Sequence, residues 1–170
     1  NKNYNVPIFI NEEESSVRYS FNVNKTFVKI EKYDYDIAVI KMEGISDYTG
    51  FFGFKGEFLI LLSDDEYRVP VKAYFNSSLG NIVCELISYK KKSWKPPAFS
   101  KWNNQIIMLK LNLILAIIIS SLGISYGQNK VLSEGEELNY IVYYGFIKLG
   151  EVKMRVTGKY SENEKNIYSA

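Results

Sequence analysis

Residues 61–90 read LLSDDEYRVPVKAYFNSSLGNIVCELISYK, and this stretch decides what kind of fold to expect. Apolar and polar side chains alternate over residues 68–75, which is the pattern of a strand that buries one face. The turn before it, at 63–66, is Ser-Asp-Asp-Glu, and aspartate side chains in turns accept hydrogen bonds from nearby backbone N–H groups. Pro70 lies inside the strand pattern and predicts an edge strand or a β-bulge there. The stretch therefore predicts antiparallel hairpins.

Strand patterns continue on both sides of this stretch at intervals of about ten residues. They are predicted at 17–21, 26–33, 37–42, 58–62, 82–89, 136–144, 150–160 and 166–170, with a short connection at 22–25. The continuous apolar run at 58–62 indicates a strand buried on both faces. Tyr (14) and Phe (10) are abundant, as is typical of β-rich chains. We therefore predict a mostly β fold, in which an antiparallel meander forms a partial barrel or a curved sheet.

One segment departs from the strand pattern. Residues 108–128 read MLKLNLILAIIISSLGISYGQ, which is a methionine, one early lysine, an apolar run and small residues before the final glutamine. This is the layout of a secretory signal peptide, with cleavage between Gly127 and Gln128. If it stays uncleaved, the segment at about 106–126 forms an apolar helix that matches the roughly 20 residues needed to span a bilayer.

The composition argues against several classes of function. The chain has no histidine and a single cysteine, Cys84, so we expect no His-based catalysis, no intrachain disulfide and no typical zinc site. It also lacks the glycine-rich loops that cradle nucleotide phosphates. The net charge is only +2, with no basic stripe, so nucleic acid is not an expected partner. We predict no catalytic residue, metal or cofactor, and interpret Cys84 as a small buried hydrophobe.

A glycine-rich and aromatic stretch contains the candidate ligand-binding residues. Residues 44–56 read GISDYTGFFGFKG. As an apolar loop at the mouth of a small barrel, this stretch would place Tyr48, Phe51, Phe52 and Phe54 around an apolar ligand. The other interpretation is a glycine-relieved bend within one long hairpin.

A second candidate site is the acidic turn. Asp64, Asp65 and Glu66 are consecutive carboxylates, with Arg68 nearby. Adjacent carboxylates can bind a hard cation or act as an acid–base pair. We favour a solvated turn, because aspartate has a local role in capping turn backbone. The chain is therefore predicted not to be an enzyme, and a carboxylate-based enzyme or metal site at this turn is the alternative.

Two parts of the chain resemble opposite ends of one family. The opening motif is carried by Gly135, Glu136, Leu138, Tyr140, Tyr143, Gly145, Leu149 and Gly150, within residues 132–158. The closing motif is carried by Asp64, Asp65, Glu66, Arg68, Pro70, Val71, Gly80, Glu85, Leu86, Ile87 and Tyr89. Both motifs resemble bacterial exported proteins of the domain-of-unknown-function 3108 family, and residues 6–21 are similar to a strand pair shortly before the family's end.

In this chain the family's end precedes its beginning. The resemblance implies the C-terminal part of a β-barrel-like domain at 1–92, a linker or tail at 93–107, a signal peptide or signal-anchor helix at 108–127, and a truncated N-terminal part of such a domain at 128–170. We therefore expect a fragment that spans two tandem genes. In the alternative, the 128–170 strands pair with the 6–92 strands in one incomplete barrel, because the termini of a domain often lie close together.

The resemblance also sets the expected function. It implies an exported protein of the periplasm or cell envelope, anchored in the membrane if 106–126 is not cleaved, whose non-catalytic β-barrel-like domain binds or scaffolds. One alternative is a periplasmic carrier of an apolar or lipid ligand, which rests on fold analogy. Another is a structural assembly partner in the envelope. The oligomeric state is left open.

Overall fold

The computed structural model describes residues 3–10, 13–48, 54–77, 80–100, 132–162 and 165–169. The strands in these ranges are β1 (Asn3–Ile10), β2 (Glu13–Val28), β3 (Ile37–Ser46), β4 (Phe54–Ser63), β5 (Pro70–Ser77), β6 (Gly80–Lys90), β7 (Glu137–Tyr144), β8 (Ile147–Arg155), β9 (Gly158–Glu162) and β10 (Lys165–Ser169). The described ranges contain no helix, and hence none that could cross a bilayer. The predicted helix at 106–126, the signal peptide at 108–127 and the cleavage site at Gly127 and Gln128 lie outside them.

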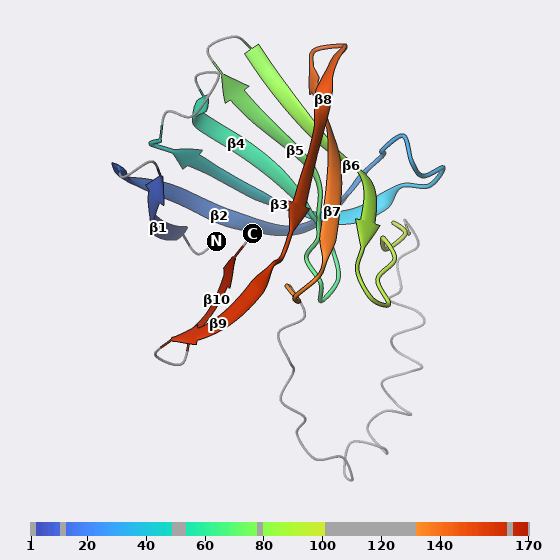
Figure 1. Ribbon diagram of the computed structural model, residues 1–170. Coiled ribbons are helices and arrows are strands. Elements are labelled where there is room, and N and C mark those ends of the chain that lie inside the picture. Colours follow the sequence, from blue (N-terminus) through green and yellow to red (C-terminus); the bar gives the residue numbers. More distant parts are fainter. Residues whose placement is uncertain are drawn as a thin grey trace, which may run out of the picture. The chain divides into compact units, whose positions relative to one another are not determined.

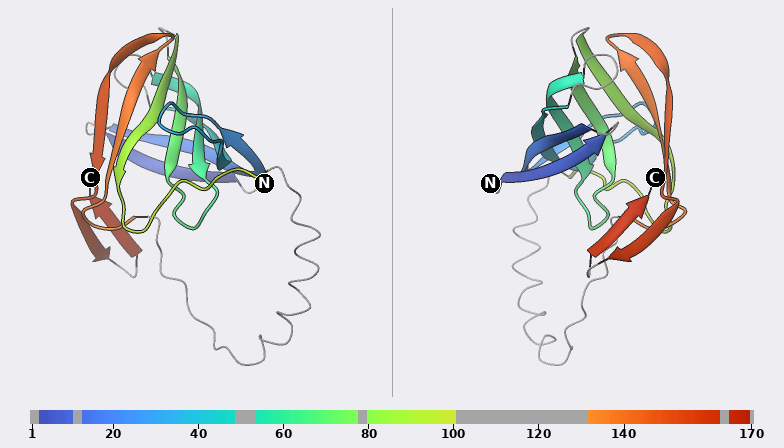
Figure 2. Two further views of the ribbon diagram at one scale, coloured as in Figure 1. Left: turned by 90° about the vertical axis from the view of Figure 1, so that its right-hand side faces the viewer. Right: turned by 60° about the vertical axis from the view of Figure 1, so that its left-hand side comes forward.

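Strands β1 to β8 form one antiparallel sheet whose spatial order follows the chain, so the predicted mostly β meander is confirmed. The sheet does not close, and β1 and β8 are its two edges. Figures 1 and 2 show that it is twisted and curved. Strands β9 and β10 pair with each other as a separate two-stranded sheet.

The pairing of β6 with β7 joins the two parts of the chain that resemble opposite ends of one family. Cys84 lies opposite Val142 and Lys90 opposite Glu137 in this antiparallel ladder. The side chains add to it, because Asn139 Nδ2 donates to Ser88 Oγ at 2.6 Å. The prediction that the 128–170 strands pair with the 6–92 strands is therefore confirmed for β7.

Strand β2 differs from its prediction. The short connection expected at 22–25 is instead a register irregularity between Asn22 and Thr26 within one strand, and both halves pair with β3. The backbone N–H of Asn24 donates to Asn22 Oδ1 at 3.0 Å, so the asparagines satisfy the backbone locally without reversing the chain. The strand predicted at 26–33 ends at Val28.

Pro70 opens β5, which lies between β4 and β6. Of the two predicted settings, the edge strand is therefore wrong. The bulge is confirmed, because the β4–β5 register shifts between Leu61 and Leu62, where Leu62 is the partner of Pro70. A proline at the first strand position has no N–H to give, and the bulge lets the ladder continue beyond it.

The buried core includes part of the segment that follows β6. Its members are Val28, Ile30, Ile37, Val39, Leu61, Val69, Val71, Leu86, Trp94 and Tyr140. Trp94 is only 3% exposed and packs edge-on against Tyr89, with ring centroids 4.5 Å apart. Beyond Trp94, Ala38 N donates to Pro97 O at 2.8 Å. The first residues of the predicted linker at 93–107 therefore run along β3 and cover apolar side chains.

Candidate functional site

Two rows of apolar side chains cross one face of the eight-stranded sheet. Successive Cα partners define the first row as Tyr19, Gly44, Phe58, Phe75 and Ile82. The second row is Phe21, Met42, Ile60, Ala73, Cys84 and Val142. Because residues two apart in a strand share a face, the two rows lie side by side on the same face.

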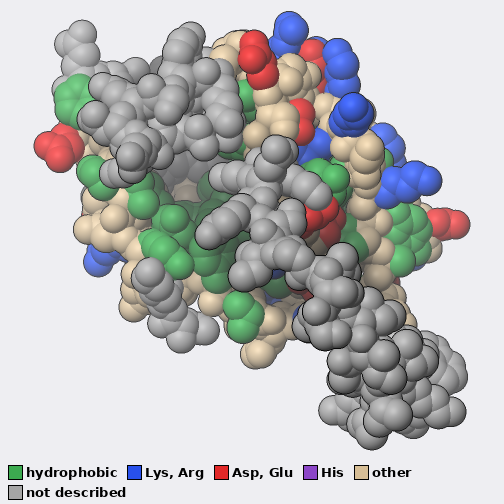
Figure 3. All heavy atoms as spheres, turned by 90° about the horizontal axis from the view of Figure 1, so that it is seen from below, with side chains coloured by type: hydrophobic (Ala, Val, Ile, Leu, Met, Phe, Trp, Pro, Cys, Tyr) green, Lys and Arg blue, Asp and Glu red, His purple; other side chains and the backbone are tan. Residues whose placement is uncertain are grey.

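This face borders a hollow of about 930 Å³ to which each of the eight strands contributes lining residues. Val6 and Ile8 reach it from the β1 edge, and Leu149 and Val152 reach it from the β8 edge. Opposite edges of an open sheet can line one hollow only where the sheet curves strongly. Figure 3 shows hydrophobic side chains gathered around a hollowed region of the surface.

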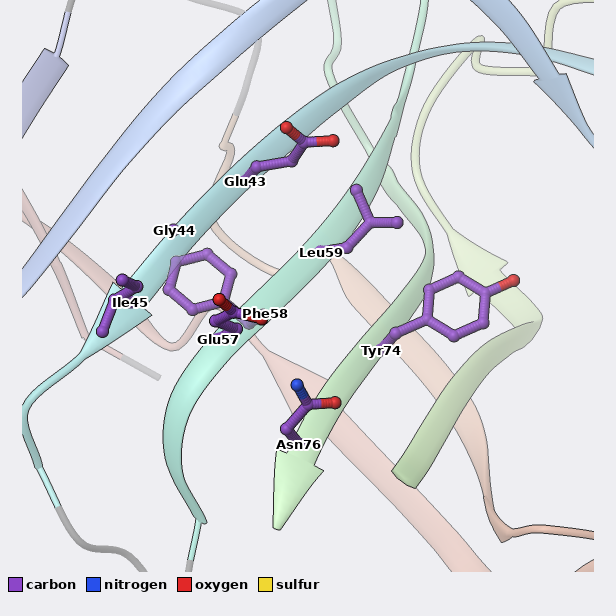
Figure 4. A pocket seen from close by; sticks show the side chains of 8 residues that line it. All are labelled: Glu43, Gly44, Ile45, Glu57, Phe58, Leu59, Tyr74 and Asn76. Carbon is purple, nitrogen blue, oxygen red and sulfur yellow. The ribbon is translucent and has the colours of Figure 1, made fainter. Parts of the chain in front are cut away.

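Gly44 and Phe58 shape the middle of this surface. A Cβ atom on Gly44 would lie 2.5 Å from Cζ of Phe58 and 2.8 Å from Cβ of Tyr19. Figure 4 shows the Phe58 ring beside Gly44, among the residues that border a second, smaller hollow of about 470 Å³. A glycine is required here because the ring and the backbone carbonyl oxygen of Arg18 occupy the space that any side chain would need.

The predicted ligand-binding residues have different outcomes. Tyr48 lines the large hollow. Phe54 opens β4 and pairs with Ser77, but its side chain is not described. Phe51 and Phe52 lie outside the described residues. The prediction centred on residues 44–56 and did not include the strand residues that form most of the lining. The period-two alternation of these strands indicates which of their side chains share a face.

The lone cysteine is one of these strand residues. Cys84 is half-buried and lines the hollow, whereas the sequence predicted a buried thiol in a strand core. Burial raises the pKa of the thiol above its ordinary value of 9.0, because the thiolate would lose solvation. The thiol is therefore a poor nucleophile at neutral pH. Because it lines the hollow, a bound ligand is expected to change its accessibility to thiol reagents.

Asp65 organises the acidic turn. Its Oδ1 accepts hydrogen bonds from Ser63 Oγ at 2.8 Å, Tyr67 N at 3.0 Å and Arg68 N at 3.2 Å. Its Oδ2 accepts one from Trp94 Nε1 at 2.9 Å. Both carboxylate oxygens are thus engaged in holding the hairpin and the segment after β6. This geometry supports a structural role for Asp65.

Asp64 is held by two cations. Its carboxylate lies 3.1 Å from Lys25 Nζ and 3.2 Å from an Arg68 nitrogen. Partial burial acts to raise its pKa, but the hydrogen bonds and charges of Lys25 and Arg68 outweigh it and leave the pKa below 3.8. Within the described ranges, no group of three or more His, Cys, Asp or Glu side chains could hold a metal ion.

Two further carboxylates form buried ion pairs. Glu85 lies 2.6 Å from Lys72 and also accepts the backbone N–H of Glu31 at 2.7 Å. Glu136 lies 2.6 Å from Lys91, whose side chain is 1% exposed and which sits over the ring of Tyr67. These contacts tie loops to the sheet, and none of the four paired side chains lines the large hollow.

Comparisons of the chain with models of protein families, with curated proteins and with solved structures found no match. The resemblance carried by the two end motifs stays a prediction.

Proposed function

We propose that this chain belongs to an exported, non-catalytic protein whose curved sheet binds the apolar part of a small molecule such as a lipid. The observation that carries the proposal is the hollow lined by all eight strands. Its volume of about 930 Å³ falls within the roughly 300–1,000 Å³ typical of small-molecule sites. Its surface is made mainly of aliphatic and aromatic side chains, so an alkyl chain would gain about 0.8 kcal/mol for each CH₂ removed from water.

The first experiment measures binding of the fluorescent apolar probe N-phenyl-1-naphthylamine to the purified chain. We expect saturable enhancement, because the probe leaves water for the hollow. Cys84→Trp places a bulky ring within the lining and is expected to reduce affinity about tenfold, or about 1.4 kcal/mol. Val83→Trp is the matched control, since the neighbouring position on the same strand faces away from the hollow. Equal affinity in both variants would contradict the proposed site.

Native mass spectrometry of the protein purified from a bacterial envelope gives an independent check. We expect a bound species with the mass of a lipid. A lipid-free protein with no probe binding would instead support the scaffolding alternative, for which the structure offers exposed apolar residues on the β8 edge, namely Leu149, Val152 and Met154.

The export part of the proposal rests on the signal-peptide pattern at 108–128. A reporter enzyme that is active only in the periplasm, fused behind residues 108–132, is expected to be active in bacteria. A fusion in which Leu115 and Ile118 are both replaced by Asp is the control, because charges in the apolar run abolish recognition as a signal. An inactive unmodified fusion would remove the support for export.

A further inference from the structure

The charges of the sheet are sorted by face. Arg18 lies between Val17 and Tyr19, which both line the hollow, so alternation puts Arg18 on the opposite face. The same reasoning puts Lys41, beside Met42, and Lys153, beside Val152, on that opposite face. The remaining strand cations that alternation assigns to the same face are Lys72, Lys90, Lys148 and Arg155.

The strand cations therefore point away from the hollow. Among the described lining residues, Glu57 and Glu151 are the charged ones, and there is no lysine or arginine. Glu151 lies 3.2 Å from Lys148, but both of these side chains are more than half exposed, at 59% and 54%. By the same alternation Glu57, beside Phe58, and Glu151, beside Val152, point to the opposite face and only border the hollow. An anionic group inside the hollow would therefore meet no cation among the described lining residues.

The neutral polar groups of the lining gather at one end of the hollow. Ser46 is the Cα partner of Gly56 at the end of the β3–β4 ladder, and Tyr48 follows two residues later. Asn76, near the end of β5, borders the same end, although alternation with Phe75 puts its side chain on the opposite face. The deeper row through Met42, Ile60 and Cys84 has no such groups. An amphiphile would therefore leave its polar end near Ser46 and its tail along the apolar rows.

We infer that the ligand is an alkyl-chain molecule with an uncharged polar end, such as an alcohol, and that acidic lipids such as fatty acids are disfavoured. This inference rests on the proposed function. Burying a hydroxyl beside hydrogen-bonding side chains costs little, whereas burying an unpaired carboxylate costs far more. Selection against acidic ligands follows, because the described lining residues include no lysine or arginine that could pair with a carboxylate.

The test compares hexadecanol with hexadecanoate as competitors of the naphthylamine probe on the same protein at neutral pH. We expect hexadecanol to displace the probe at a concentration about tenfold lower. Equal or stronger displacement by hexadecanoate overturns the inference and leaves the proposed function intact. If neither compound displaces the probe, or the probe itself does not bind, the proposed function fails as well.

A second experiment places a positive charge at the polar end of the hollow. Ser46→Lys introduces a cation at the position where the polar group would rest, and Ile45→Lys introduces the same charge on the opposite face of the same strand. We expect the first variant to improve hexadecanoate affinity at least about fivefold relative to hexadecanol, and the second to leave the ratio unchanged. The inference is overturned if the ratio of hexadecanoate affinity to hexadecanol affinity is the same in the two variants. Circular dichroism shows that both variants are folded.

Discussion

At the scale of single residues, the Asp65 side chain holds the acidic turn together and fixes the segment after β6 to it. One carboxylate satisfies a hydroxyl, two backbone N–H groups and an indole N–H. The indole belongs to Trp94, which is 3% exposed and part of the buried core. Loss of the carboxylate would therefore leave donors unsatisfied in a region that water reaches poorly.

We expect Asp65→Ala to lower the free energy of unfolding by about 2–4 kcal/mol, the range for several buried donors left without an acceptor. Urea denaturation followed by tryptophan fluorescence measures it. Glu66→Gln, at the exposed neighbouring position, is the control and is expected to change stability by about 0.5 kcal/mol or less. If the two variants are equally stable, the turn does not anchor Trp94 as described.

The sequence predicted this turn well and the ligand site poorly, for a physical reason. Asp65 accepts hydrogen bonds from Ser63, Tyr67 and Arg68, all within three positions, and this part of its role follows from turn chemistry. Its bond to Trp94, 29 positions away, could not be predicted in this way. The hollow depends on Phe58, Ile60 and other side chains from distant strands meeting on one face. In β4 both faces are apolar over 58–62, so alternation cannot tell which one meets the core and which one lines the hollow.

At the scale of the strands, the β3–β4 contact depends on the absence of a side chain at Gly44. An added methyl group would meet the Phe58 ring, the Cβ atom of Tyr19 and the carbonyl oxygen of Arg18. The ring can move aside, but the backbone of β2 cannot do so without disturbing its ladder with β3. The contact thus links three neighbouring strands through one position.

Gly44→Ala is therefore expected to destabilise the protein by about 1–3 kcal/mol through overpacking. The double variant Gly44→Ala with Phe58→Leu is expected to lose less than the sum of the two single changes, because the smaller side chain vacates part of the space. Thermal unfolding of the four proteins in this cycle measures the coupling. Strict additivity would show that the ring does not occupy the position beside Gly44.

At the scale of the whole sheet, β6 and β7 belong to one ladder although 46 residues separate Lys90 from Glu137. Alternation predicted both strands, and the likeness of the two segments to opposite ends of one family predicted that they pair. What the sequence could not provide was the register, because the Leu86–Ser88 shift in β6 changes which residues face each other. The register places Cys84 opposite Val142.

This register makes the pairing directly testable, because Val142→Cys creates a second thiol opposite the native one. Cα partners in an antiparallel pair lie about 4.5–5.5 Å apart, within the range that a disulfide spans. Mild oxidation should therefore link Cys84 to the introduced thiol within one chain and stabilise the fold by about 4 kcal/mol, the value for a loop of this length. Peptide mapping by mass spectrometry identifies the bond. Tyr143→Cys, on the other face, should stay reduced, and failure of Val142→Cys to form an intrachain bond would show that the two segments do not share one sheet.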